Sequence, residues 1–203
     1  MSQVRRPTTN ILPISLYQVN TQLWHVLRSY KDGNEVMRRE FRTVVAATIA
    51  RFVNRHWPCV ARLAGGPPTL VTTVPSTREP PRPGEHPLVT AVKRCARLVD
   101  LYRPVLARGP GQVAHRRAND DAFEVTRPLR EARVLLVEDT FTSGARTQSA
   151  ASALQRAGAS GLAVVVVGRV INPDYSDASR RIWDTAGERQ FDFDTCCRCV
   201  LRS

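Results

Sequence analysis

The segment from Val134 to Thr147 constrains the fold most, because it joins an unbroken apolar run to two acids, a hydroxyl-rich turn and a helix-forming stretch. Residues 134–137 are β-branched or leucine without polar alternation, which is typical of a strand buried on both faces of a parallel sheet. Ligands of such sheets bind at the carboxyl ends of the strands, where Glu138 and Asp139 stand. The segment therefore predicts an α/β fold with a ligand site at this strand end.

A turn and a helix follow the two acids. The chain must turn between Thr142 and Gly144, and the alanine-rich stretch from Ala145 to the terminator Gly158 is helical by propensity. A helix N-terminus offers free backbone N–H groups and a positive dipole end, both of which favour a phosphate. An ordinary helix capped by Thr142 or Ser143 is the simpler interpretation. The apolar strand, the acidic pair and Thr-Ser-Gly together favour a sugar-phosphate site instead.

This order of residues resembles the signature of the type I phosphoribosyltransferases that binds 5-phosphoribosyl 1-pyrophosphate (PRPP). The resemblance implies that the acidic pair holds the ribose 2′ and 3′ hydroxyls and that the loop holds the 5′-phosphate. The implied PRPP-binding residues are Glu138, Asp139, Thr140, Phe141, Thr142, Ser143, Gly144, Ala145, Arg146 and Thr147. The chain departs from the pattern at Arg146, where the family usually has Thr or Ser. Either Arg146 contacts the phosphate, or it points away and Thr147 substitutes.

Three further segments are similar to the ComF-like branch of this family. They are Ser29-Tyr30-Lys31-Asp32-Gly33, Thr73-Val74-Pro75-Ser76 and the stretch 114–125, Ala-His-Arg-Arg-Ala-Asn-Asp-Asp-Ala-Phe-Glu-Val. The correspondence covers roughly residues 12 to 170. The N-terminal Cys-rich zinc module of the branch is absent, and residues 82–88 replace an expected Arg-Gly-Phe-Asn-Gln stretch. The acceptor substrate therefore stays open.

The length of 203 residues and the apolar content of 42% predict one domain, residues 1–203. Its core spans 69–170, and a hood is expected from residues 1–62 and the C-terminal tail 172–203. The alternation of strands and helices between residues 70 and 168 predicts a parallel twisted sheet with helices on both faces. The polar stretch 108–121 lies between two short strands and predicts a mobile hairpin. The expected strands are 11–17, 70–74, 104–107, 122–126, 134–137 and 162–168, and the expected helices 21–30, 35–56 and 88–101.

The resemblance also implies a reaction, in which a nitrogenous acceptor displaces pyrophosphate from C1′ of PRPP. Electrostatic stabilisation and positioning suffice for this step, so we expect no covalent nucleophile. Magnesium is the implied cofactor, carried by PRPP, with Asp139 as the candidate protein ligand. Glu138, Asp139 and Arg78 are the expected catalytic residues. The expected pyrophosphate-binding residues are Ser76, Thr77, Arg78, Lys31, Arg116 and Arg117, with Arg108 as a further candidate.

The chain is strongly basic, with 30 Lys and Arg against 18 Asp and Glu and a formal net charge of +12. Such a charge suits either an anionic small substrate or nucleic acid. A PRPP-sensing regulatory protein that binds nucleic acid through its basic surface is therefore the alternative function. The sequence has no helix-turn-helix, zinc-finger or RNA-binding signature, which favours the enzyme. The resemblance further implies a homodimer.

The five cysteines are odd in number and lack a framework spacing, which argues against a secreted disulfide scaffold. No apolar stretch reaches the ~18 residues of a membrane span, and the N-terminus has no signal-peptide core, so we expect a cytoplasmic protein without a membrane partner. Cys196, Cys197 and Cys199 form a cluster. Metal binding there would need Cys59, His56 or another chain, so reduced thiols are the favoured interpretation.

Overall fold

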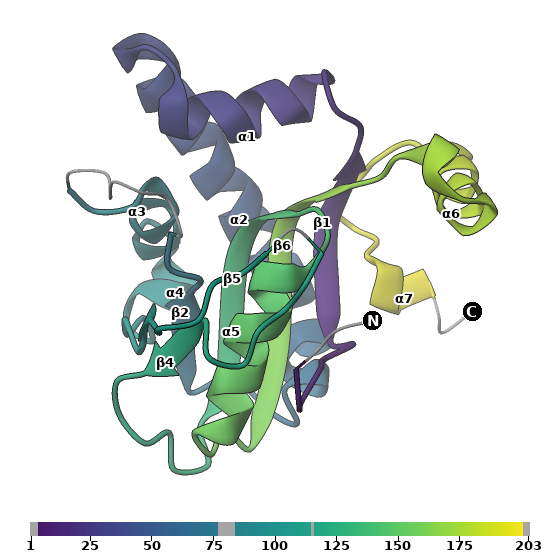
Figure 1. The fold of residues 1–203 in the computed structure, drawn as a ribbon. Helices are drawn as coiled ribbons and strands as arrows, with labels where there is room; N and C mark the ends of the chain where they lie inside the picture. Colours follow the sequence, from purple (N-terminus) through teal and green to yellow (C-terminus); the bar gives the residue numbers. More distant parts are fainter. Residues whose placement is uncertain (1–3, 77–83, 115, 201–203) are drawn as a thin grey trace.

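The computed structural model describes residues 4–76, 84–114 and 116–200. A four-stranded sheet in the order β1-β6-β5-β2 forms its centre (Figure 1). All its strand pairs are parallel. The strands are β1 (Ile11–Tyr17), β2 (Leu70–Thr73), β5 (Arg133–Phe141) and β6 (Gly161–Val170). The predicted α/β class, with a parallel sheet flanked by helices, is confirmed.

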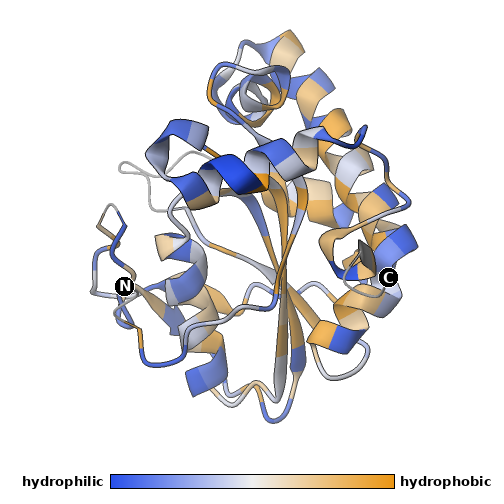
Figure 2. Ribbon diagram, turned by 90° about the vertical axis from the view of Figure 1, so that its right-hand side faces the viewer, coloured by the Kyte–Doolittle hydropathy of each residue, from blue (hydrophilic) through white to orange (hydrophobic). Residues whose placement is uncertain are grey.

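Side chains along β5 alternate between two apolar cores. Leu135 and Val137 pack on the face covered by α2 (Glu35–Leu63), and Val134 and Leu136 on the face covered by α5 (Ala145–Arg156). Figure 2 shows the apolar residues gathered along the sheet and the helix faces that cover it. Because both faces are buried, the strand needs an unbroken apolar run. The same alternation directs the two acids that follow to opposite faces.

Helix α1 (Gln22–Asp32) follows the end of β1 directly and lies across the carboxyl edge of the sheet (Figure 1). It packs on α2, a longer helix than the predicted 35–56. Helix α2 kinks at His56, where φ is −109° and ψ is 20°, and then continues to Leu63. Pro58 causes the kink, because it lacks an N–H and its ring crowds the carbonyl four residues earlier.

The N-terminal segment is built into the core, which corrects the expected hood of residues 1–62. Strand β1 pairs with β6 along the sheet, and the second half of α2 covers one face. Every second position of β1 at its start is buried, so this strand completes the apolar layer. Of the described part of this segment, α1 and the start of α2 stand above the carboxyl edge (Figure 1).

The expected strands 104–107 and 122–126 do not join the parallel sheet. They form β3 (Leu106–Arg108) and β4 (Phe123–Val125), which pair antiparallel in a sheet of their own. The open edge of β2 is instead bridged by Tyr102. This bridge also explains why the expected helix 88–101 splits into α3 (Pro87–Lys93) and α4 (Ala96–Val99). The backbone is extended at Cys95, and the break returns the chain to the sheet, where Leu101 and Arg103 bond to the backbone of Val71.

The connection between β3 and β4, predicted as a mobile hairpin, is docked on α5 along its second limb. The Asn119 N–H donates to the Ser149 hydroxyl at 2.9 Å, and the Ser152 hydroxyl donates to the Asp120 carboxylate at 2.6 Å. Arg156 donates to the Asp120 carbonyl at 2.7 Å. Hydrogen bonds to α5 thus fix this limb along the middle and the C-terminal end of that helix.

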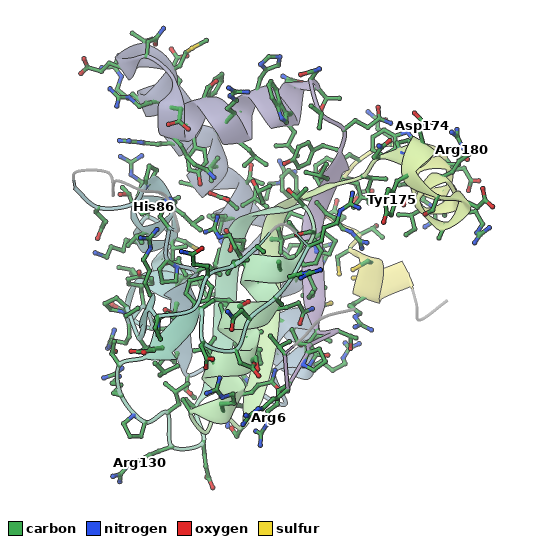
Figure 3. All side chains as sticks on the ribbon, in the orientation of Figure 1. Arg6, His86, Arg130, Asp174, Tyr175 and Arg180 are labelled. Atoms are coloured by element: carbon green, nitrogen blue, oxygen red, sulfur yellow. The ribbon has the colours of Figure 1, made fainter. Side chains whose placement is uncertain are left out.

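The C-terminal tail leaves β6 and folds back. Its elements are a 3₁₀ turn (Pro173–Tyr175), α6 (Asp177–Gly187) and α7 (Cys197–Val200), which returns to β1. Figure 3 shows Asp174, Tyr175 and Arg180 together at the start of α6, and His86 at the start of α3, where it caps the helix. None of the helices in the described ranges combines the length and apolar character that a membrane crossing requires.

Candidate functional site

The connection between β5 and α5 lines an open cleft of about 420 Å³ at the carboxyl edge of the sheet. The strand brings Asp139 and Thr140 to this edge, and α1 brings Lys31 from the opposite side. Among the described residues, its lining is Lys31, Val113, Ala114, Asp139, Thr140 and residues 142–147. The cleft therefore gathers most of the implied PRPP-binding segment around one space.

Asp139 anchors α1 to the sheet. Its Oδ2 accepts a hydrogen bond from the Tyr30 hydroxyl and lies 2.7 Å from the Lys31 ammonium. Burial alone raises the pKa of this carboxyl, but the charge of Lys31 and the hydrogen bonds from Lys31 and Tyr30 outweigh burial and hold the pKa below its ordinary value. Burial, together with the charge of Asp139, raises the pKa of Tyr30 well above its usual value, so the phenol stays a donor. Asp139 is therefore a buried, ionised carboxylate in the lining of the cleft.

Glu138 lies on the other face of the sheet, toward α5, and does not line the cleft. Its Oε1 is 3.6 Å from the Arg146 guanidinium, and its buried Oε2 has no hydrogen-bond partner among the described residues. Burial raises the pKa of Glu138 from 4.5 to about 7, with Asp139 adding to the shift and Arg146 opposing it. The two buried acids thus differ: Asp139 is charged and lines the cleft, and Glu138 titrates near neutrality beneath the loop.

This difference predicts a pH-dependent stability gap between Glu138→Gln and the unchanged chain. A raised folded pKa means that the stabilising contribution of Glu138 is present below its unfolded pKa and is lost as the pH rises through about 7. Between about pH 5 and about pH 7, the Gln variant should gain on the order of 2 kcal/mol in unfolding free energy relative to the unchanged chain. Urea unfolding at both pH values measures this gain.

The matched control is Glu188→Gln, because Glu188 is exposed at the end of α6. This variant should follow the unchanged chain at both pH values. If the difference in unfolding free energy between Glu138→Gln and the unchanged chain does not change with pH, the raised pKa of Glu138 is contradicted.

The loop itself depends on Gly144. Its φ is +76°, in the left-handed region that glycine adopts readily, and a Cβ there would lie 2.3 Å from the Phe141 ring. Gly144 also occupies the N-cap of α5 and so supplies no capping side chain, and the Ser143 hydroxyl accepts weakly from the Ala145 N–H at 3.4 Å. The start of α5 therefore faces the cleft without a strong side-chain cap.

Arg146 and Thr147, the two alternatives for the phosphate contact, both border the cleft. Arg146 lines the cleft, but its guanidinium turns to Glu138 and donates to the Pro75 carbonyl at 3.2 Å. Thr147 also borders the cleft, although its side chain is buried. Arg146 thereby links the ends of β2 and β5, and its half-exposed side chain keeps a face toward the cleft.

The predicted pyrophosphate-binding residues divide by position. Lys31 lies in the cleft, and Ser76 lies nearby at the end of β2, where its carbonyl accepts from Arg108 at 2.8 Å. Thr77 and Arg78 fall outside the described residues. Arg116 borders a neighbouring cleft of about 460 Å³ on the other side of the loop, and Arg117 is exposed and lines neither cleft.

Two site residues are absent from the sequence-based candidates. Tyr30, which bonds Asp139, adjoins Lys31 in the Ser-Tyr-Lys-Asp-Gly element, and this adjacency was the available signal. Tyr175 lines the neighbouring cleft, and the Arg116 guanidinium stacks 4.8 Å from its ring centroid. No local pattern in the sequence marks Tyr175, because the tail folds back to reach this place.

A scan of protein-family models found no match to the chain, and a search of curated proteins found none either. The functional assignment therefore rests on the chemistry and geometry of the cleft.

Proposed function

We propose that the chain is a PRPP-binding phosphoribosyltransferase of the type I fold, which transfers the 5-phosphoribosyl group to a nitrogenous acceptor and releases pyrophosphate. The observation that carries the proposal is the cleft at the end of β5, where a hydroxyl-glycine loop and the open start of α5 face the Lys31–Asp139 ion pair. These groups complement a sugar that carries both a phosphate and a diol.

The loop is suited to the 5′-phosphate. Backbone N–H groups at the start of α5 and the exposed hydroxyls of Thr142 and Ser143 provide donors, and the helix dipole adds a positive potential. Hydrogen bonds to a charged group contribute about 1.5–3 kcal/mol each, so a few of them account for specific binding of a monoester.

Asp139 and Lys31 are suited to the rest of PRPP. The ionised carboxylate of Asp139 lines the cleft and can accept hydrogen bonds from ribose hydroxyls there. The Lys31 side chain is 21% exposed, and its flexible stem lets the ammonium turn from Asp139 toward an incoming pyrophosphate. Glu138, on the opposite face, is a positioning residue that holds Arg146 under the loop.

The cleft fits a magnesium ion that arrives with its substrate better than one held by the protein. Asp139 is the one carboxylate among the described lining residues, and Lys31 already neutralises its Oδ2. Mg²⁺ usually keeps several waters and binds through one or two carboxylates and substrate phosphates. When bound to PRPP, the ion would neutralise charge on the leaving pyrophosphate, and Asp139 is its candidate protein contact.

Pyrophosphate release from PRPP tests the proposal. The full chain is incubated with PRPP and magnesium and with nucleobases, ammonia, glutamine or aromatic amines in turn. We expect release with one acceptor class, no release without magnesium, and unchanged release in Asp184→Asn, whose side chain is exposed on α6.

A chain that binds PRPP but releases no pyrophosphate with any acceptor overturns the transferase proposal. The sensor alternative would then require duplex or RNA binding that weakens steeply with salt, because phosphate neutralisation releases counterions.

A further inference from the structure

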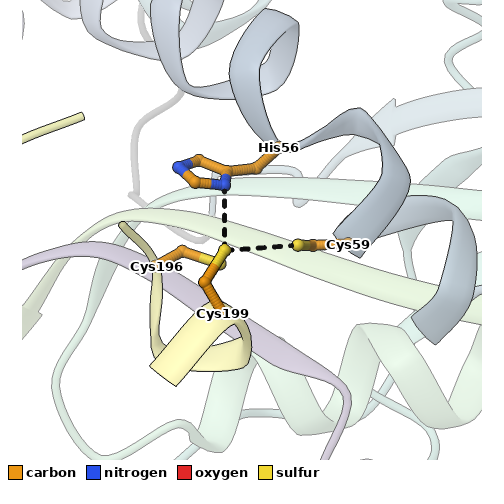
Figure 4. A group of neighbouring side chains, drawn as sticks. All are labelled: His56, Cys59, Cys196 and Cys199. Carbon is orange, nitrogen blue, oxygen red and sulfur yellow. Dashed lines mark hydrogen bonds between the residues drawn. The ribbon is translucent and has the colours of Figure 1, made fainter. Parts of the chain in front are cut away.

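Four side chains from two distant segments meet beside β1, away from the cleft (Figure 4). His56 and Cys59 come from the kinked half of α2, and Cys196 and Cys199 come from the C-terminal segment. Their ligand atoms all lie within 4.8 Å of one another. His56, Cys59 and Cys196 are buried, and Cys199 is partly exposed. The group is therefore a compact, nearly closed set of three sulfurs and one nitrogen.

The three separations from Cys199 are close to the edges of a zinc tetrahedron, and the other ligand atoms also lie within 4.8 Å of one another. Cys199 Sγ lies 3.7 Å from Cys59 Sγ, 3.5 Å from Cys196 Sγ and 3.6 Å from His56 Nδ1. With Zn–S bonds of about 2.3 Å and Zn–N bonds of about 2.0–2.1 Å, a tetrahedral site has S–S edges of about 3.8 Å and S–N edges of about 3.6 Å. A disulfide needs sulfurs about 2.05 Å apart, so the set is spaced for a shared ion.

The imidazole is also oriented for a metal. Its Nε2 lies 2.9 Å from the Phe193 carbonyl, and a carbonyl can only accept, so Nε2 carries the proton. In the neutral ring, Nδ1 then presents its lone pair to the sulfurs. Zinc-binding histidines typically donate their other N–H to a carbonyl or carboxylate in this way, which fixes the tautomer.

Sequence spacing supports the same chemistry. His56-x2-Cys59 and Cys196-x2-Cys199 are two pairs with the ligand spacing of structural zinc sites, separated by most of the chain. From the sequence, metal binding by the C-terminal cysteines would need Cys59, His56 or another chain, and reduced thiols were the favoured interpretation. The fold returns the tail to α2 and so brings His56 and Cys59 of the same chain to these cysteines.

We propose that His56, Cys59, Cys196 and Cys199 bind one Zn²⁺ ion in a structural site that fastens the C-terminal segment to α2. The three thiols lose their protons to solvent on binding, and the Arg62 guanidinium interacts electrostatically with Cys59 and Cys199, which offsets the excess negative charge. All four positions are filled by protein, so the ion has a structural rather than a catalytic role. The proposal does not depend on the function of the cleft.

Metal analysis of the full chain, purified under reducing conditions without chelator, tests the site. We expect one zinc per chain. Cobalt substitution should give the thiolate-to-cobalt charge-transfer band and the intense visible bands of a tetrahedral ion. Removal of the zinc with a chelator should lower the melting temperature, because the ion binds the folded chain and not the unfolded chain.

Cys199→Ser should lower the zinc affinity by at least about 100-fold. The matched control is Cys197→Ser, because Cys197 is exposed in the same short helix and lies outside the group. This control should keep one zinc per chain. Equal zinc content in the two variants contradicts the proposal.

If Cys199→Ser does not fold, metal analysis of the unchanged chain is the deciding measurement. A chain that takes up neither zinc nor cobalt overturns the proposal. A disulfide between Cys59 and Cys199, or between Cys196 and Cys199, in freshly reduced and repurified protein also overturns it.

Discussion

Gly144→Val is expected to lower PRPP affinity by at least about a thousandfold, or about 4 kcal/mol. A β-branched residue is strained at a φ of +76°, and its Cβ would meet the Phe141 ring. The loop must then move, and the backbone donors at the start of α5 lose their common direction. Losing two or three charge-assisted hydrogen bonds accounts for the expected loss. Calorimetric titration with PRPP and magnesium measures it.

Gly187→Val is the matched control. Gly187 ends α6, and a Cβ there would meet nothing within 4 Å. This variant should bind PRPP as the unchanged chain does. Undiminished affinity in Gly144→Val would separate PRPP binding from the loop.

Asp139→Asn should likewise remove PRPP binding, by a thousandfold or more. The neutral amide deprives the ribose hydroxyls of an ionised acceptor and leaves Lys31 and Tyr30 without their common partner. Truncating one member of a buried, hydrogen-bonded charge pair costs about 2–5 kcal/mol in comparable cases. Calorimetry on folded protein, verified by circular dichroism, measures the loss.

The control for this variant is Asp184→Asn, which removes the same charge from the exposed face of α6. Equal PRPP affinity in the two variants would show that Asp139 serves only to anchor α1.

The sheet could be predicted because its strands are locally encoded. Residues 134–137 and 162–168 are apolar without alternation, and the structure buries both strands on both faces. The helix from Ala145 was equally visible from its alanines and its terminating glycine. The short strands near residues 106 and 124 were found as elements, but nothing local specifies which strand pairs with which.

The part of the site that is nearly contiguous in the sequence could be predicted, and the contacts between distant segments could not. Thr140 and residues 142–147 line the cleft and are nearly contiguous in the sequence, so their spacing contained the information. The separation of Glu138 from Asp139 follows from strand alternation and could have been anticipated. The contact of Tyr30 with Asp139, and the meeting of His56 with Cys199, join residues more than 100 positions apart. Such contacts depend on the assembled fold.

The most direct test of the PRPP cleft is calorimetric titration of the full chain with PRPP, with and without magnesium. We expect one binding site per chain with micromolar affinity, at least tenfold weaker binding without the ion, and competition by ribose 5-phosphate, which shares the sugar and the monoester. A chain that gives no heat with PRPP at millimolar concentration in magnesium contradicts the account.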